Sequence, residues 1–208
     1  MSFSNLTNLQ EEMYRCRRCL DAGYPITPGA IFSGGPSAAV MVVGQAPGVR
    51  ERGNGQPFSG PAGTRLFQWL AQAGWREDKF RATQYITAIS KCYPGKPPRP
   101  TTLLQQPPRG DRVPSAAERN LCTPFLEQEL EIVQPELILP IGRVAINRFL
   151  GKGKLTDLIG NLFERDGRVV LPLPHPSGAN VWLNRPESKR LLEAALGHLK
   201  QLKKGMQL

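Results

Sequence analysis

Apolar residues gather in four short runs along the chain, and each run leads into polar or glycine-rich sequence. Because the runs are short and rich in β-branched or aromatic residues, they predict β-strands over residues 38–43, 83–89, 136–142 and 168–174. Between and around them, apolar residues recur at helical spacing. This predicts helices over residues 4–15, 62–74, 143–150 and 185–204, and another that opens at Ser115 and kinks or restarts at Pro124.

The alternation of strands and helices predicts an α/β domain with a central, mostly parallel sheet covered on both faces. In such sheets the functional loops lie at the carboxyl ends of the strands. Three loops follow predicted strands, namely "VGQAPGVRERGNGQPFSGPAG", "SKCYPGKPP" and "HPSGAN". We expect these loops to meet at one edge of the sheet.

Composition narrows the class of protein. A chain of 208 residues suits a single domain over residues 1–208. Lys and Arg number 27 against 17 Asp and Glu, and this net charge of +10 favours a polyanionic partner such as DNA. No apolar run is long enough to span a membrane, and the N-terminus lacks the pattern of a signal peptide. A cytoplasmic location, with no membrane partner, is therefore expected.

The segment from about 93 to 112 differs from its surroundings. It is rich in proline, which excludes a helix or a central strand, and it carries Lys96, Arg99, Arg109 and Arg112. We expect a long surface loop, inserted into the domain, that either adds DNA phosphate contacts or is a tolerated insertion.

The chain contains four cysteines, Cys16, Cys19, Cys92 and Cys122. Disulfides are not expected in a cytoplasmic protein, and the Cys16-x-x-Cys19 spacing lets two thiolates reach one metal centre. Four thiolates could complete either a zinc site or an iron–sulfur cluster, and spacing alone does not separate the two. The alternative is a chance CxxC pair with two buried thiols.

Several segments, in order, resemble the iron–sulfur uracil-DNA glycosylases of family four. They are "VVGQAPGVRERGNGQPFSGPAGTRL", "YITAISKC", "GDRVPSAAERNLCTPFLEQEL", "ILPIGRVA" and "LPLPHPSG". The resemblance implies a three-layer α/β/α fold with a four-stranded, mostly parallel sheet. It also implies a [4Fe–4S] cluster held by the four cysteines, and hydrolysis of the bond between a flipped base and its sugar.

The resemblance also assigns site residues. It makes His175, Glu51 and Gln45 the catalytic candidates, and it implies base contacts from Gly44, Gln45, Phe58, Ala88 and His175. Phe58 is the aromatic on which the base stacks, and Ser177 is the residue that contacts phosphate. Independently, the Ser177 hydroxyl and the Gly178 amide are suited to bind a DNA phosphate.

Three features depart from the family pattern. Gln45 replaces a glutamate, and Ala88 replaces the asparagine that reads the uracil edge in "YITN". Alanine has no donor or acceptor with which to discriminate a base. Asn180 or backbone groups would have to compensate for this loss. The separation between Cys92 and Cys122 also exceeds the family's usual spacing.

Two functions follow as the main alternatives. The first is a monomeric DNA repair glycosylase that excises uracil or another deaminated base. The second is a non-catalytic or weakly active DNA-binding protein on the same fold. A zinc-stabilised nucleotide-binding protein is a third reading, and the match in five segments speaks against it.

Overall fold

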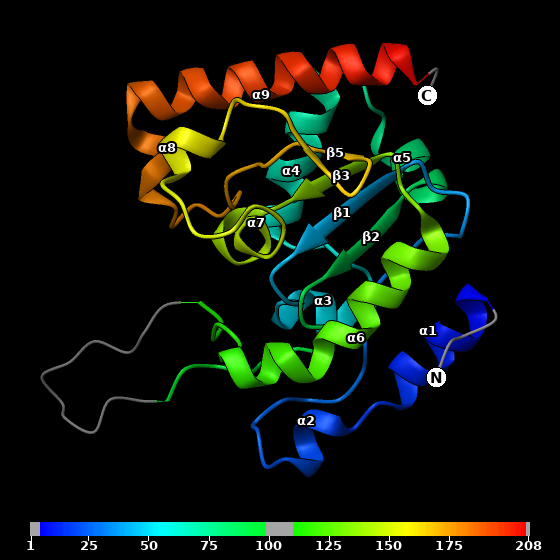
Figure 1. The fold of residues 1–208 in the computed structure, drawn as a ribbon. Coiled ribbons are helices and arrows are strands. Elements are labelled where there is room, and N and C mark those ends of the chain that lie inside the picture. The colour runs from blue at the N-terminus through cyan, green and yellow to red at the C-terminus, as the bar shows by residue number, and fades with distance from the viewer. Residues whose placement is uncertain (1–4, 99–109, 207–208) are drawn as a thin grey trace, which may run out of the picture.

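The computed structural model describes residues 5–98 and 110–206 (Figure 1). Its centre is a sheet with the strand order β2-β1-β3-β5-β4. The strands are β1 (Val40–Gly44), β2 (Tyr85–Ala88), β3 (Leu137–Pro140), β4 (Phe163–Arg165) and β5 (Arg168–Val170). β2, β1, β3 and β5 are parallel, and β4 pairs with β5 in antiparallel direction. The predicted α/β fold with a mostly parallel sheet is confirmed.

The number of strands differs from the prediction, because β4 adds a fifth. β4 is a short edge strand joined to β5 by Asp166 and Gly167, both with positive φ (+52° and +72°). An Asp-Gly pair favours this tight hairpin turn. β4 lacks a continuous apolar run because its last two residues are exposed, so its pattern does not resemble that of the four buried strands.

Helices cover both faces of the sheet (Figure 1). One face packs against α4 (Pro61–Gln72), α5 (Glu77–Thr83) and α9 (Pro186–Gly205). The other packs against α1 (Leu6–Arg15), α6 (Ala116–Val133) and α7 (Gly142–Leu150). The shorter helices are α2 (Arg18–Asp21), α3 (Val49–Asn54), α8 (Leu155–Leu158) and the 3₁₀ helix η1 (Val181–Asn184).

Strand β1 shows why the predicted strands are continuously apolar. Val40 and Val42 face the α4/α9 side, while Met41 and Val43 face the α1/α6 side, and all four are fully buried. A strand buried on both faces has no polar alternation. In the described part of the chain, no helix is both long and apolar enough to cross a membrane.

Helix α6 begins with the predicted capping box. The Ser115 hydroxyl accepts from the Glu118 amide at 3.2 Å, and the Glu118 carboxylate accepts from the Ser115 amide at 2.7 Å. The helix then continues through Pro124 to Val133, so the expected restart does not occur. The packing of α6 against α1 and the sheet outweighs the hydrogen bond that Pro124 cannot donate.

The carboxyl ends of the parallel strands meet at one edge of the sheet. Gly44, which ends β1, is in register with Ala88, which ends β2. Beyond β5, Leu173 bridges Ile141 in parallel direction and so brings the "HPSGAN" loop to the same edge. All three predicted loops therefore contribute to one pocket, the second through Pro94, together with the far end of the insertion.

Candidate active site and thiol cluster

An open pocket of about 490 Å³ lies at the carboxyl edge of the sheet. Its walls come from the loop after β1, from helix α3, from the end of β2, from both ends of the insertion and from the "HPSGAN" loop. All eight residues predicted for catalysis, base binding and phosphate binding line it: Gly44, Gln45, Glu51, Phe58, Ala88, His175, Ser177 and Gly178. The tertiary structure thus brings residues far apart in the sequence into one site.

His175 is held in one orientation by the backbone around it. The Ser177 amide donates to Nδ1 at 3.3 Å, which leaves the proton of a neutral ring on Nε2. Burial lowers the pKa of His175, and the charge of Glu51 opposes that shift. Because the pKa lies below its usual value near 6.5, the ring is neutral at pH 7. His175 is therefore a neutral hydrogen-bond donor in the pocket wall.

Gly142 allows His175 to pack closely against the start of α7. Gly142, at the start of α7, has φ of +80°, and a Cβ there would lie 3.0 Å from the Cβ of His175 and 3.2 Å from its Cδ2. Both the backbone conformation and this close approach favour glycine. The "PIGR" turn after β3 therefore supports the His175 loop from behind.

Phe58 lies beside the end of β1. A Cβ added at Gly44 would be 3.0 Å from the Cζ atom of Phe58, so the ring lies directly against the Gly44 backbone. Phe58 is half-buried and packs partly against the α4/α9 core. It thus combines a packed position with a surface in the pocket, as a stacking platform for a base requires.

Glu51 connects two backbone segments of the pocket. One carboxylate oxygen accepts from the Gly48 amide and the other from the Gly60 amide, each at 3.1 Å. Among the described residues, Glu51 forms no ion pair with its neighbours Arg50 and Arg52. Glu51 therefore links two segments of the glycine-rich loop, and its charge lies near His175.

The two positions that depart from the family are neighbours in space. Ala88 is in register with Gly44, the last residue of β1, and Gln45 directly follows Gly44. Both line the pocket. Within the described residues, the Gln45 side-chain amide has no intramolecular hydrogen bond. Position 88 therefore lacks a side-chain amide, but the Gln45 amide, which makes no intramolecular hydrogen bond among the described residues, lies nearby.

Asn180 cannot take the place of the absent asparagine in this arrangement. Its Nδ2 donates to the His175 carbonyl at 2.8 Å, and its Oδ1 accepts from the Trp182 amide at 3.2 Å. The side chain therefore caps η1 and fastens the His175 loop. The same loop is held from outside by Arg65, which donates to the Ser177 carbonyl at 3.3 Å.

Sequence reasoning missed Asp111, at the end of the insertion. Asp111 lines the pocket, and its Oδ2 accepts from the Val49 amide at 3.2 Å. Its Oδ1 accepts from the Tyr93 hydroxyl at 3.1 Å and from Lys96 at 2.7 Å. An aspartate inside a proline-rich insertion has no local signal that would reveal this role.

The described ends of the insertion are therefore anchored to the domain. Arg112 forms two hydrogen bonds of 2.6 Å with the buried Glu118 carboxylate and a third to the Pro94 carbonyl. The hydrogen bonds from Arg112, together with those between Glu118 and Ser115, lower the pKa of Glu118 to about 2. Of the four cations expected to contact phosphate, Lys96 and Arg112 pair with acids instead. Arg99 and Arg109 lie outside the described residues.

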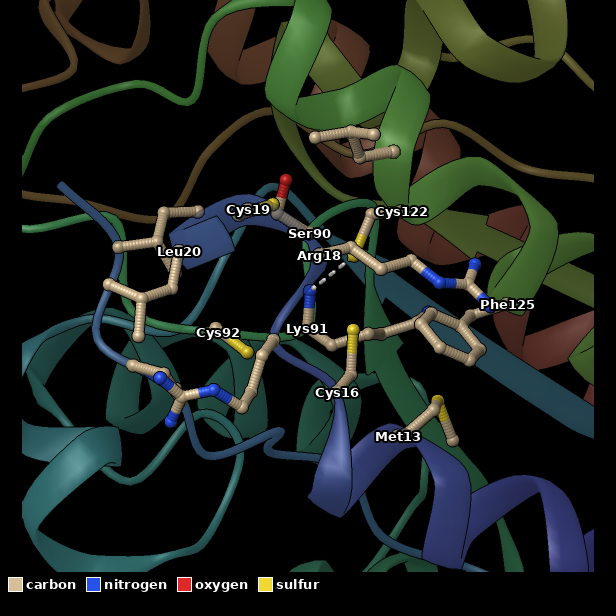
Figure 2. Close-up of a pocket in the computed structure, with 14 residues that line it drawn as sticks. Met13, Cys16, Arg18, Cys19, Leu20, Ser90, Lys91, Cys92, Cys122 and Phe125 are labelled. Atoms are coloured by element: carbon tan, nitrogen blue, oxygen red, sulfur yellow. Dashed lines mark hydrogen bonds between the residues drawn. The ribbon is translucent and has the colours of Figure 1, made fainter. Parts of the chain in front are cut away.

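The four cysteines line a second, small cavity between α1, α2, α6 and the end of β2 (Figure 2). The Lys91 amide donates to the Cys122 sulfur at 3.3 Å. Burial and the neighbouring cysteines raise the pKa of Cys19 to about 11 and that of Cys92 to about 12. Across residues 5–98 and 110–206, no three His, Cys, Asp or Glu side chains are grouped as one metal ion requires.

A buried ion pair lies between the cysteine cavity and the pocket. The Lys91 ammonium donates to Glu129 at 2.5 Å, to the Ala88 carbonyl at 2.7 Å and to the Thr87 hydroxyl at 2.8 Å. Glu129 also accepts from the Tyr85 hydroxyl at 3.0 Å. A single lysine shortly after an apolar strand gives only a weak signal in the sequence, so this network was also missed.

Comparison with known proteins finds a matching family model and several relatives. The family model of the uracil DNA glycosylase superfamily matches residues 32–200. A type-4 uracil-DNA glycosylase of Archaeoglobus fulgidus is 33% identical and covers 91% of this chain and 89% of its own. Those of Thermotoga maritima (28% identity; 94% and 91% covered) and Sulfurisphaera tokodaii (27%; 95% and 84%) are also similar. Because the family model spans most of the chain, this protein belongs to the uracil DNA glycosylase superfamily.

Proposed function

We propose that this protein is a DNA glycosylase that hydrolyses the bond between deoxyribose and uracil, or another deaminated base, flipped into the pocket. The observation that carries the proposal is the pairing of a neutral, oriented His175 with Phe58 in one pocket at the carboxyl edge of the sheet. The relatives named as type-4 uracil-DNA glycosylases support the same chemistry.

The geometry suits the two charges that develop in this reaction. As the bond breaks, negative charge forms on the base, and the His175 Nε2–H can donate to its carbonyl oxygen. Positive charge forms on the sugar, and the Glu51 carboxylate supplies a nearby negative charge. Water adds its hydroxyl to the sugar carbon, and its proton ends on the released base. Glu51 retains free lone pairs that can hold this water, and Gln45 can orient it.

Base recognition is assigned to the β1 and β2 ends. Phe58 stacks on the flipped base, and the side-chain amide of Gln45 reads its polar edge in place of an asparagine at 88. The Gln45 amide has both a donor and an acceptor, so it can pair with a lactam edge shared by uracil and deaminated purines. Ser177 and Gly178 bind the flanking phosphate, and a monomer is sufficient for this site.

The four cysteines are proposed to hold a [4Fe–4S] cluster. They line one cavity, and the Cys16-x-x-Cys19 spacing lets two of the thiolates reach one metal centre. Four cysteine thiolates are the usual ligand set of such a cluster. Bound there, the cluster would act as a structural crosslink. The ligands would tie the N-terminal segment to β2 and α6.

Substituting the two pocket residues tests the glycosylase proposal. On duplexes that each contain one uracil, hypoxanthine or xanthine, His175→Ala is expected to slow single-turnover excision by about 10²-fold. Phe58→Ala is expected to weaken binding by about tenfold, because base stacking is worth roughly 1–3 kcal/mol. Binding to undamaged duplex is the control and should not change. Native protein that binds DNA but releases no base would favour the non-catalytic alternative.

Cysteine substitution tests the cluster. Anaerobically purified protein is expected to contain about four irons and to absorb near 400 nm. Cys122→Ser should lose this absorbance and lower the thermal midpoint by about 10 °C. Ser90→Ala is the matched control, since Ser90 lines the same cavity without a thiol. Stoichiometric zinc without iron would contradict the cluster.

A further inference from the structure

Phe58 has a backbone conformation that an aromatic residue rarely adopts. Its φ is +51°, and only Gln134 and Asp166 share a positive φ among the non-glycine residues described. The left-handed region is sterically unfavourable for a bulky side chain, so surrounding contacts must hold it there. Such outliers often mark functional sites, and Phe58 lines the proposed base pocket.

Arg81, on helix α5, makes the contacts that hold this turn. Its Nη1 donates to the Pro57 carbonyl at 2.8 Å, and its Nη2 donates to the Phe58 carbonyl at 2.9 Å. A planar guanidinium can bind two consecutive carbonyls in this way, whereas the single ammonium of lysine cannot reproduce the fork.

The guanidinium is itself fixed in place. Its Nε donates to Glu77 at 2.9 Å, and its central carbon lies 4.1 Å from the centre of the Phe67 ring. The Arg81 side chain is only 15% exposed. Since its N–H groups are directed to a carboxylate and two carbonyls, it is poorly placed to bind a DNA phosphate.

A glycine completes the support of the turn. A Cβ at Gly63 would lie 1.7 Å from the Phe58 carbonyl oxygen, so only glycine lets α4 approach this closely. The Phe58 carbonyl therefore lies between Gly63 and Arg81. The position of this carbonyl determines the position of the Phe58 ring, which packs against the Gly44 backbone on the pocket side.

We propose that Arg81 is a positioning residue for base recognition: its guanidinium holds Phe58 in the left-handed conformation that presents the ring to the flipped base. Arg81 does not line the pocket and acts only through the two carbonyls. The inference rests on the proposed glycosylase function, because it assigns Phe58 to base stacking.

The test compares Arg81→Lys with Arg76→Lys. Arg76 precedes the same helix, is 73% exposed and contacts Asp78 rather than the turn. Binding is measured to two duplexes, one with an uncleavable 2′-fluoro-deoxyuridine and one with a tetrahydrofuran abasic site. We expect Arg81→Lys to weaken binding to the fluoro-uridine duplex by about tenfold and to leave abasic binding unchanged. Arg76→Lys should change the affinity for neither duplex.

A crystal structure of Arg81→Lys provides a readout that does not depend on the base. We expect residue 58 to leave the left-handed region or its ring to move away from Gly44. A retained φ near +50° with an unmoved ring would overturn the inference, as would equal losses on both duplexes. If the native protein does not bind the fluoro-uridine duplex more tightly than the abasic duplex, the uracil assignment fails. The crystal structure of Arg81→Lys would still decide the role of Arg81.

Discussion

Replacing Lys91 with methionine is expected to lower the free energy of unfolding by about 3–5 kcal/mol. The side chains of Lys91 and Glu129 are only 2% and 0% exposed. Methionine fills similar space but leaves the Glu129 carboxylate buried without its cation. The loss should appear as a lower denaturant midpoint at an unchanged m-value.

Two further variants make this first prediction specific. Lys91→Met combined with Glu129→Gln removes both charges and keeps an oxygen for the Tyr85 and Thr87 hydroxyls, so it should recover much of the loss. Lys96→Met breaks the exposed ion pair with Asp111 and should have little effect, because that lysine side chain is 59% exposed. A small loss in Lys91→Met, similar to that in Lys96→Met, would contradict the assigned ion pair.

Restoring the family's polar residues is expected to raise uracil excision by about 10³-fold. The change is Ala88→Asn together with Gln45→Glu. An asparagine at 88 would present a donor and an acceptor to the uracil edge, and sites that hydrogen-bond a substrate discriminate by up to about 10⁴–10⁵-fold. The measurement is single-turnover excision from uracil duplexes, with cytosine duplexes showing no gain.

Ala88→Leu is the matched control for that gain. Leucine has the same branching and the same number of side-chain heavy atoms as asparagine, but it is bulkier and has no polar group, so it should reduce excision of every base by filling the pocket. If the native protein already excises uracil efficiently and asparagine adds nothing, recognition does not depend on position 88. The uncommitted Gln45 amide would then be the first residue to substitute.

The position of Lys91 gives its substitution a second consequence. Its ammonium contacts the Ala88 carbonyl and the Thr87 hydroxyl in the pocket wall, and its amide contacts the Cys122 sulfur (Figure 2). The same residue therefore contacts two residues that line the pocket and itself lines the thiol cavity. Stability and base recognition should decline together in Lys91→Met.

Much of the fold was predictable from local patterns. Four strands and five helices were identified because burial on one or both faces of an element leaves a repeating apolar pattern in the sequence. The short helices α2, α3, α5 and α8 and the edge strand β4 were not, since they bury too few residues to leave such a pattern. Of the two outcomes predicted at Pro124, a restart does not occur, because tertiary packing keeps α6 continuous.

The order of the motifs was sufficient to indicate the family. The resemblance to that family then supplied the candidate pocket residues in "GQAPG", "PFSG" and "HPSG". Whether those side chains are free or bound was decided only by the tertiary structure. Glu51 bridges two loop amides, Asn180 caps a helix, and Arg81, Asp111 and Glu129 hold the site from elements distant in sequence. Contacts between distant residues leave no periodic signal, so these positioning roles could be identified only after the chain had folded.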